Sequence, residues 1–352
     1  MEYLIPSEWF DGLSQWMLLL LSAASVAVLA KAADLVVEGA SGIAQGMGVP
    51  KVVVGATIVS LGTTSPECAV SVVAAWSGEP GLALGNAVGS IIVDSGLIFG
   101  LGCLLSRLPA DRFILNRQGW VQFGSGLLLV LVCWSVYKIA GNEAVIGRSM
   151  GFLFVALLAA YLVFSVRWSR GHPELAAQMG SEAGDVTHGT FRLWLSVLAG
   201  LVLVLLSSRV LICSVIELAE NHWFIPKVVI AATLVAFGTS LPELVIGMAS
   251  IYRGHNELLV GNIIGADVLN VLFVVGFSAV AAPLPVVEAG ASLPQILLYV
   301  HLPFMLGILV LFRVFIFRAS SKGWFQRWYG VPLLLIYGIY LVTQISLGTL
   351  GE

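Results

Sequence analysis

The chain has 352 residues, of which 59% are hydrophobic and only 11% are charged, and its mean hydropathy is +0.98. Soluble domains carry roughly a quarter charged residues, so a water-soluble globule is excluded. The net charge of −3 offers no basic surface for nucleic acid, and the acidic excess is too small to indicate an acid-rich binding tail. The composition therefore predicts a helical protein that crosses the lipid bilayer several times.

Ten apolar runs are long enough to span a bilayer as helices. In chain order they cover residues 16–37, 49–76, 81–105, 120–137, 146–166, 191–216, 226–252, 258–282, 293–317 and 328–350. The longest polar connection, residues 167–190, follows the fifth run and is expected to be a cytoplasmic linker. The chain then divides into a first half at 1–166 and a second half at 191–352, each with five spans.

The basic residues predict the orientation of the chain. With ten spans, 12 lysines and arginines lie in loops on the side opposite both termini, and three lie on the terminal side. Because basic loops stay in the cytoplasm, both termini are predicted to be non-cytoplasmic. The first apolar run follows acidic residues and lacks the basic start of a secretory signal, so we expect it to be retained as a span. We expect a multi-pass protein of the cell (inner) membrane.

The two halves contain the same sequence pattern. Segment 50–100 aligns with segment 226–276 without a gap, at a constant offset of 176 residues. Matched pairs include Gly62-Thr63 with Gly238-Thr239, Pro66-Glu67 with Pro242-Glu243, Gly85-Asn86 with Gly261-Asn262 and Gly89 with Gly265. Because five is odd, the second copy must be inserted upside down relative to the first. The predicted fold is an all-α polytopic membrane protein with ten transmembrane helices in two inverted five-helix repeats, the architecture of alternating-access transporters.

The polar residues within the spans collect in the matched segments, GTTSPE at 62–67 and GTSLPE at 238–243, each followed by a GN-x-x-G helix. Pro66 and Pro242 each remove a helical hydrogen bond, so we expect each helix to break at its polar patch and to free carbonyl ligands. Residues four apart share a helical face, which pairs Thr63 with Glu67, Ser90 with Asp94 and Thr239 with Glu243. These faces are expected to converge on one pocket.

The chemistry of this pocket suits a hard cation. Carboxylates, hydroxyls, amides and carbonyls are the oxygen ligands of Ca²⁺ and Na⁺, and the soft ligands of zinc or copper are missing from the pattern. Glu67, Glu243 and Asp94 together would leave about three uncompensated charges in low dielectric, each costing several kcal/mol unless cations or protons neutralise them. Such a site favours exchange over one-way transport. We expect no resident cofactor, because the bound Ca²⁺ and Na⁺ are the transported ions.

These motifs resemble the two alpha-repeats of the sodium/calcium exchanger family, within the cation/calcium exchanger superfamily. The resemblance implies exchange of Ca²⁺ for Na⁺, with the site formed by spans two, three, seven and eight, and with spans one and six sliding as a gate. It implies Ca²⁺ ligands at Glu67, Glu243, Thr63 and Thr239, and Na⁺ positions lined also by Thr64, Ser240 and Ser90.

The sequence departs from the family pattern at three places. Ala266 stands where a serine is expected opposite Ser90, which leaves the number of Na⁺ positions open. Asp94 and Asn270 form an acid/amide pair, and relatives differ in which half carries the acid, a difference associated with K⁺ dependence in some branches. Asp267 replaces a frequent asparagine and is either a member of the site or a paired or hydrated residue at its edge.

Several alternatives stay open. A Ca²⁺/H⁺ antiporter of the same superfamily, or a K⁺-dependent one, is the nearest, although Ca²⁺/H⁺ members resemble a GN-x-x-E helix, and this chain has Gly89 and Gly265 at that position. An intramembrane hydrolase would need a His or Lys base beside its nucleophile, and neither polar patch, GTTSPE or GTSLPE, contains one. A non-transporting membrane scaffold would not need two buried glutamates. The sequence indicates no protein partner.

Overall fold

The computed structural model describes residues 6–47, 49–76, 80–111, 114–170, 190–218, 221, 240–287 and 295–350. Within these residues, eight helices are long and apolar enough to cross a membrane, and a further candidate is the pair Lys51–Ser65 and Glu67–Trp76. The short apolar helix Leu241–Tyr252 belongs to the seventh predicted span, of which residues 226–239 lie outside the described residues. Each predicted span therefore has a counterpart in the expected order, and the protein is a multi-pass helical membrane protein.

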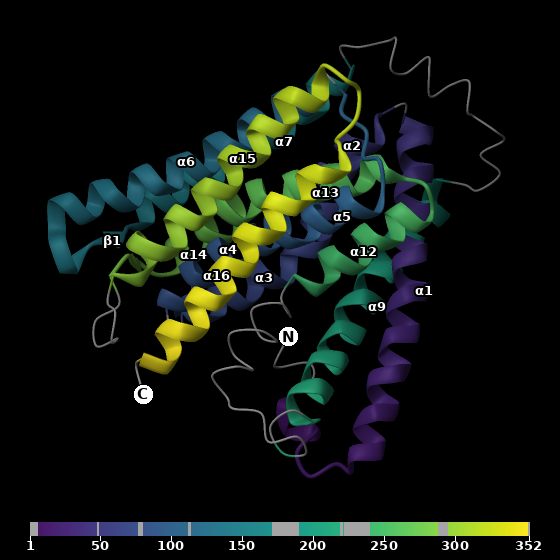
Figure 1. Ribbon diagram of the computed structural model, residues 1–352, viewed down its shortest axis with the longest axis horizontal. Coiled ribbons are helices and arrows are strands. Elements are labelled where there is room, and N and C mark those ends of the chain that lie inside the picture. Colours follow the sequence, from purple (N-terminus) through teal and green to yellow (C-terminus); the bar gives the residue numbers. More distant parts are fainter. Residues whose placement is uncertain are drawn as a thin grey trace.

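The elements are labelled as in Figure 1, where η marks a short 3₁₀ or π segment. In chain order they are η1 (Ser7–Trp9), α1 (Gln15–Met47), α2 (Lys51–Val54), η2 (Gly55–Val59), α3 (Ser60–Trp76), α4 (Pro80–Ile92), η3 (Val93–Ile98), α5 (Phe99–Leu105), α6 (Ile114–Ala140), η4 (Gly141–Glu143), β1 (Val145–Ile146), α7 (Arg148–Arg170), α9 (Thr190–Glu217), α12 (Leu241–Tyr252), α13 (Asn256–Leu269), η7 (Asn270–Val275), α14 (Gly276–Ala281), β2 (Leu284–Pro285), η8 (Leu297–His301), α15 (Leu302–Ser320), η9 (Arg327–Tyr329) and α16 (Gly330–Leu350).

The helices of the two halves pack against one another crosswise. The third span of the first half, through η3 and α5, packs on α16, the last span of the second half. In the same way η7 and α14 of the second half pack on α7, the last span of the first half. The two fourth spans, α6 and α15, contact each other. Equivalent helices thus exchange partners between the halves, as a pseudo-twofold relation requires.

Two short backbone bridges repeat this relation at opposite ends of the molecule. Pro285 of β2 pairs with Val145 of β1, and its equivalent Pro109, 176 residues earlier, forms a bridge with Trp324. Figure 1 shows β1 at one end of the bundle and the turn between α15 and α16 at the other. The bridges join equivalent segments at opposite ends, so the prediction of two inverted repeats is confirmed.

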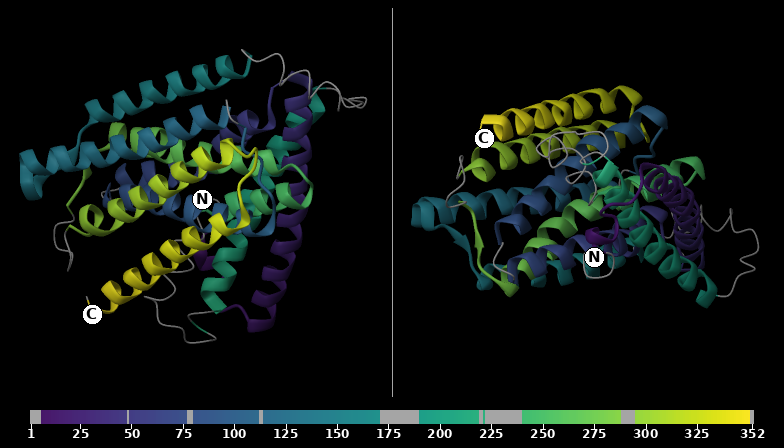
Figure 2. Two further views of the ribbon diagram at one scale, coloured as in Figure 1. Left: turned by 45° about the horizontal axis from the view of Figure 1, so that its top comes forward. Right: turned by 90° about the horizontal axis from the view of Figure 1, so that it is seen from below.

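Helices α1 and α9 form a pair along one side of the bundle, which the further views in Figure 2 also show. Their backbones approach closely at two glycines. A Cβ at Gly39 would lie 2.7 Å from a methyl carbon of Val197, and one at Gly200 would lie 2.9 Å from the carbonyl oxygen of Ala32. Small residues at such crossings are typical of helix packing in membranes, where close backbone contact replaces hydrophobic burial.

The prediction that each polar patch breaks its helix is corrected in the first half. Helix α3 continues through Pro66, and the chain bends by 44° between Lys51–Ser65 and Glu67–Trp76. A proline removes one hydrogen bond and clashes with the preceding turn, and a bend relieves both effects without ending the helix. In the second half, Pro242 lies in the first turn of α12, where a missing N–H leaves no extra carbonyl unpaired.

Widened π turns occur at equivalent places in the third and eighth spans. The segment η3 begins at Val93, next to Asp94, and η7 begins at Asn270, the equivalent of Asp94. Such turns are frequent at functional sites because they reorient side chains within a continuous helix. They place the acid/amide pair on matched irregular backbone near the centre of the protein.

The remaining features of the chain concern its core and its boundaries. All four cysteines are free and buried, as expected for core residues. Residues 171–189 of the predicted linker lie outside the described residues, so the boundaries of the two halves stay a prediction. The orientation of the termini also stays a prediction.

Candidate functional site

The polar residues predicted from the sequence lie in the interior of the bundle. Eight of the nine are described, and none has more than 2% of its surface exposed: Thr63, Thr64, Glu67, Ser90, Asp94, Ser240, Glu243 and Asn270. Thr239 lies outside the described residues. Since membrane helices normally bury apolar residues, this concentration of buried acids and hydroxyls marks a candidate functional site.

Four spans bring these side chains together. The helix α3 carries Glu67 and packs on α4 and η7, while α12 carries Glu243 and packs on η3 and α13. Close contact of α13 with the second span depends on glycine. A Cβ at Gly261 would lie 2.1 Å from the carbonyl oxygen of Val52, and one at Gly265 would lie 2.5 Å from that of Ala56. The GN-x-x-G pattern in the second half therefore sets the distance between α13 and the helix that carries the first polar patch.

The polar side chains of one half lie beside the acid of the other. Thr63 and Thr64 lie next to the Glu243 carboxylate, and Ser240 lies next to Glu67. Within the first half, the Ser90 hydroxyl donates a hydrogen bond to Glu67 Oε1 at 2.8 Å. The predicted convergence of the matched faces is thus seen for every described member of these pairs.

Many oxygen atoms of this cluster have no hydrogen-bond partner among the described residues. They include Glu67 Oε2, both carboxylate oxygens of Asp94 and Glu243, the side-chain oxygen of Asn270, and the hydroxyls of Thr64 and Ser240. A buried polar atom without a partner costs about 1–3 kcal/mol, and a charged one costs more. A protein keeps such a group of bare oxygens where a ligand satisfies them.

The charged neighbours of Glu67 and Asp94 among the described residues are other acids. Glu243 lies close enough to Glu67 and to Asp94 for their charges to repel. Salt bridges in the part of the chain that the structure describes join Arg253 to Asp34 and to Glu38, and neither involves these acids. Burial of several unpaired carboxylates is unfavourable by several kcal/mol each, so the cluster needs cations or protons.

No group of three acidic, histidine or cysteine side chains among the described residues is close enough to hold one metal ion. A cation here would therefore be held by two carboxylates at most, with hydroxyl, amide or carbonyl oxygens completing its shell. Thr63 illustrates such a mixed environment, because its hydroxyl lies 3.2 Å from the carbonyl oxygen of Ser60 and 3.5 Å from Asn262 Oδ1. Hydroxyl and carbonyl oxygens of this kind suit Ca²⁺ and Na⁺.

Asp267 has two partners that the sequence analysis did not identify. Its Oδ2 accepts hydrogen bonds from the Ser95 hydroxyl and from Gln122 Nε2, the latter at 2.6 Å. Ser95 follows Asp94 directly, and Gln122 is a polar residue within the fourth apolar run. The position of Ser95 beside Asp94 and the polarity of Gln122 in an apolar run were the sequence signals for these partners. Neither residue belongs to the repeated pattern.

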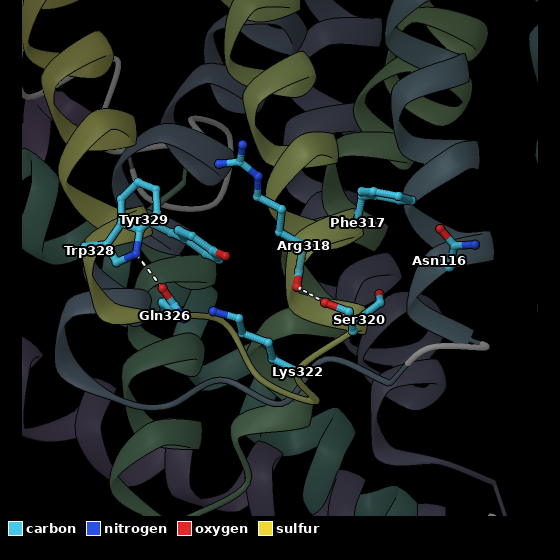
Figure 3. A pocket seen from close by; sticks show the side chains of 9 residues that line it. Asn116, Phe317, Arg318, Ser320, Lys322, Gln326, Trp328 and Tyr329 are labelled. Atoms are coloured by element: carbon cyan, nitrogen blue, oxygen red, sulfur yellow. Dashed lines mark hydrogen bonds between the residues drawn. The ribbon is translucent and has the colours of Figure 1, made fainter.

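A separate cavity of about 610 Å³ lies where α15 turns back toward α16 (Figure 3). Its lining includes Arg318 and Lys322, and no acidic residue. Figure 3 shows both basic side chains beside Gln326 and Tyr329 around this space. Since the cavity provides positive charge and no anionic ligand, it is unsuited to a cation, and the candidate site remains the buried cluster.

The sequence pattern described as "Sodium/calcium exchanger protein" matches residues 17–167 and 192–346. The chain belongs to this family. The resemblance inferred from the repeated motifs is therefore confirmed, and the two matched regions correspond closely to the two halves.

Named relatives and a solved structure agree with this membership. The chain is 33% identical over 263 residues to the putative antiporter CaxA of Alkalimonas amylolytica, a match that covers 74% of this chain and 79% of that one. It is 30% identical over 346 residues to the sodium/calcium exchanger MaX1 of Methanosarcina acetivorans, covering 89% and 94%. The solved sodium/calcium exchanger of Methanococcus jannaschii has the same fold, with a TM-score of 0.76 at 23% identity, covering 94% of this chain and 99% of that one.

Proposed function

We propose that the protein is a secondary antiporter that exchanges Ca²⁺ for Na⁺ by alternating access. The observation that carries this proposal is the pair of equivalent glutamates, Glu67 and Glu243, which are buried side by side with bare carboxylate oxygens. Two carboxylates match the charge of one Ca²⁺. Their arrangement on inverted repeats gives each half an equal share in the site, as transporters with two access states require.

The neighbouring residues divide into two proposed roles. Thr63 and Thr239 complete the Ca²⁺ ligands together with the two glutamates. Thr64, Ser240 and Ser90 line the Na⁺ positions. Asp94 and Asn270 supply one further acid and one amide at the level of the π turns. These assignments follow the family pattern residue by residue and are supported by the burial of every described member.

The charge of the cluster supports exchange over one-way release. Glu67, Glu243 and Asp94 would be left unpaired if the pocket emptied, and each unpaired buried charge is costly by several kcal/mol. Release of one cation is therefore coupled to entry of another. We propose no covalent step and no resident cofactor.

The packing at Gly265 favours Na⁺ over H⁺ as the coupling ion. The superfamily's Ca²⁺/H⁺ antiporters resemble a GN-x-x-E pattern, which would put a glutamate side chain at this position. A Cβ there would lie 2.5 Å from both the Ala56 carbonyl oxygen and Ser60 Oγ, so the helix contact leaves no room for that side chain in the second half, whereas a Cβ at Gly89 in the first half would have no atom within 4 Å. The named exchanger MaX1, which matches most of the chain, also supports Na⁺ coupling.

The access change is proposed to be a sliding of α1 and α9 over the other helices. These two helices contact each other closely at Gly39 and Gly200 and lie together along one side of the bundle (Figure 1). We further propose that the protein resides in the cell membrane with both termini outside the cytoplasm, because of the 12 to three distribution of basic residues.

The test is calcium flux in proteoliposomes that contain the purified full chain. Radioactive Ca²⁺ uptake is measured with an imposed outward gradient of Na⁺, K⁺ or H⁺ in turn, and with the Na⁺ gradient in the presence and absence of K⁺, and Glu67→Gln protein serves as the inactive control. The proposal expects uptake driven by Na⁺ alone and lost in the variant. Uptake driven by H⁺ alone would identify a Ca²⁺/H⁺ antiporter, and uptake that requires Na⁺ and K⁺ together would identify the K⁺-dependent branch.

A further inference from the structure

Asp267 carries a buried charge that the proposed exchange cycle does not use. It lies on α13 and only 1% of its surface is exposed. It is also close enough to Glu67 and Asp94 for their charges to interact. The core of the protein therefore contains four neighbouring carboxylates, one more than the matched acid positions provide.

Only one of the two carboxylate oxygens of Asp267 has hydrogen-bond partners among the described residues. Its Oδ2 accepts hydrogen bonds from Ser95 on η3 and from Gln122 on α6, and Gln122 Nε2 also lies 3.3 Å from Ser95 Oγ. Its Oδ1 is buried and has no hydrogen-bond partner among the described residues. Donors on Oδ2 stabilise the ionised carboxylate, so a positive charge is needed at the bare oxygen.

This arrangement is absent from the equivalent place in the other repeat. The residue equivalent to Asp267 is Ile91, and the residue equivalent to Ser95 is Val271; both are fully buried. The acid of the second half and its hydroxyl donor in the first half therefore both lack a polar equivalent in the other repeat. Helix packing does not require them, because buried apolar side chains fill the equivalent positions.

A metal cation suits the bare oxygen better than a proton does. A proton on Oδ1 would remove the charge of Asp267 but add an O–H donor that itself needs an acceptor. A hard monovalent cation is attracted by the carboxylate charge. It can also be bound by the lone pairs of the Ser95 hydroxyl oxygen, which stay available while the hydroxyl donates its hydrogen to Asp267. The amide oxygen of Gln122 becomes a further ligand if the side-chain amide rotates.

We infer that Asp267, Ser95 and Gln122 bind one Na⁺ beside the central pocket. This inference rests on the proposed function, in which Na⁺ is the coupling ion. The extra site restores a Na⁺ position to the half in which Ala266 lacks the expected hydroxyl. It also balances the fourth carboxylate of the core.

The experiment measures Na⁺ binding without transport. The thermal unfolding midpoint of the purified full chain is followed against Na⁺ concentration, with Ca²⁺ chelated and choline replacing Na⁺ at constant ionic strength. A ligand that binds only the folded state raises the midpoint, and the slope against the logarithm of its concentration counts the bound ions. Asp267→Asn should lower this count by one Na⁺ relative to the unchanged chain.

The matched control is Ser165→Ala, which removes a hydroxyl from a second buried polar group that contains no acid. The hydroxyl oxygen of Ser165 lies 3.5 Å from Gln118 Nε2. Gln118 lies one turn before Gln122 on α6. Its Na⁺ count should equal that of the unchanged chain. Equal counts in all three proteins would overturn the inference. If the unfolding midpoint of Asp267→Asn no longer depended on pH while its Na⁺ count stayed the same, Asp267 would bind a proton instead, and the inference would be overturned.

Two outcomes separate this inference from the proposed function. If Na⁺ does not stabilise even the unchanged chain, the Na⁺ coupling of the proposed function fails. If Asp267→Asn does not fold, Ser95→Ala keeps the charge and removes one ligand oxygen. This variant should then need a several-fold higher Na⁺ concentration for the same rise in unfolding midpoint, and an unchanged concentration would overturn the inference.

Discussion

At the scale of single residues, Glu67 and Glu243 combine full burial with unsatisfied oxygens. Their exposed fractions are 2% and 0%, and three of their four carboxylate oxygens have no hydrogen-bond partner among the described residues. A structural carboxylate in a membrane helix would be paired with a base or with several donors. The proposed role of the two glutamates as ligands of a transported cation would account for this environment.

Glu67→Gln and Glu243→Gln are each expected to abolish Ca²⁺ exchange while the protein stays folded. An uncharged amide of nearly the same volume removes an anionic ligand, and the loss of one partner from a buried charge pair costs about 3 kcal/mol or more, hence roughly 100-fold in Ca²⁺ affinity. Without cations, each variant should unfold at a higher temperature than the unchanged chain, because one uncompensated charge is gone. Ca²⁺ flux and thermal unfolding measure the two effects.

The matched control for these variants is Glu143→Gln, which changes an exposed acid in η4. It should leave both flux and unfolding temperature unchanged. Near-normal flux in either pocket variant would contradict the assignment of that glutamate as a ligand.

Asp94 and Asn270 occupy equivalent positions with opposite chemistry, which permits an exchange of residues between the halves. Asp94→Asn alone should weaken coupling to the monovalent ion more than Ca²⁺ binding, since two glutamates still neutralise the divalent ion. Asn270→Asp alone places two carboxylates near each other, so one of them should take up a proton and the flux should become more pH-dependent. The double variant should retain substantial Na⁺-driven flux.

Na⁺-driven and H⁺-driven Ca²⁺ flux, measured for the two single variants and the double variant, tests this equivalence. If the Ca²⁺ flux of the double variant were as low as that of the less active single variant, the positions of Asp94 and Asn270 would not be interchangeable between the halves.

At the scale of helices, the distance between α13 and the second span depends on glycine. Gly265→Ala would place a methyl group 2.5 Å from the Ala56 carbonyl oxygen. Because the contact atom belongs to backbone, the helices must separate, and we expect a loss of roughly 1–3 kcal/mol in the free energy of unfolding. Cation affinity should fall as well, because the second span carries Thr63 and Glu67. Thermal unfolding with and without Ca²⁺ measures both effects.

Gly307→Ala on α15 is the control for this packing effect, since no neighbouring described atom lies within 4 Å of the place that the new methyl group would take. Alanine has a higher helix propensity than glycine, so this variant should be neutral or slightly more stable. If both glycine variants lost the same stability, the close approach of α13 would not be the cause.

Arg253 joins the turn after α12 to the first span. Its Nη2 lies 2.7 Å from Asp34 Oδ2, and its Nη1 lies 2.5 Å from Glu38 Oε1, both acids being on α1. The hydrogen bond and charge of Asp34 raise the pKa of Arg253, so the pair stays ionised throughout the physiological range. These ion pairs hold α1 against the helices that carry the site in the conformation seen here.

Arg253→Gln is expected to shift the protein toward its other access state, because the proposed sliding of α1 must break these contacts. Exposed ion pairs contribute up to about 1 kcal/mol, which corresponds to about a fivefold change in the population ratio. Cysteine accessibility in the pocket from each side of the membrane measures the shift. High salt should produce a similar shift in the unchanged chain and a smaller one in the variant, and an equal salt effect in both would contradict this role.

At the scale of the whole molecule, the sequence predicts those features that repetition marks. The offset of 176 residues predicted the inverted halves, and the polar patches predicted which buried residues would meet. The partners of Asp267 were not predicted, because Ser95 and Gln122 approach it from two other spans and have no repeated signal. An interruption at Pro66 was predicted, but its form was not: the helix bends by 44° there and continues, since proline alone does not decide whether a helix ends or curves.

The inverted arrangement also predicts which loops face the same side of the membrane. Ser321 lies in the exposed turn after α15, and Glu143 is exposed next to β1, at the opposite end of the bundle (Figure 1). In a chain whose four native cysteines have been replaced, Ser321→Cys should react with a membrane-impermeant maleimide only from the cytoplasmic side, and Glu143→Cys only from the other side. The first expectation follows from the basic residues Arg318, Lys322 and Arg327 around that turn. Reaction of both cysteines from one side in sealed, right-side-out vesicles would contradict the inverted repeats, whereas reaction from opposite sides in the reverse sense would preserve the inversion and reverse the predicted orientation.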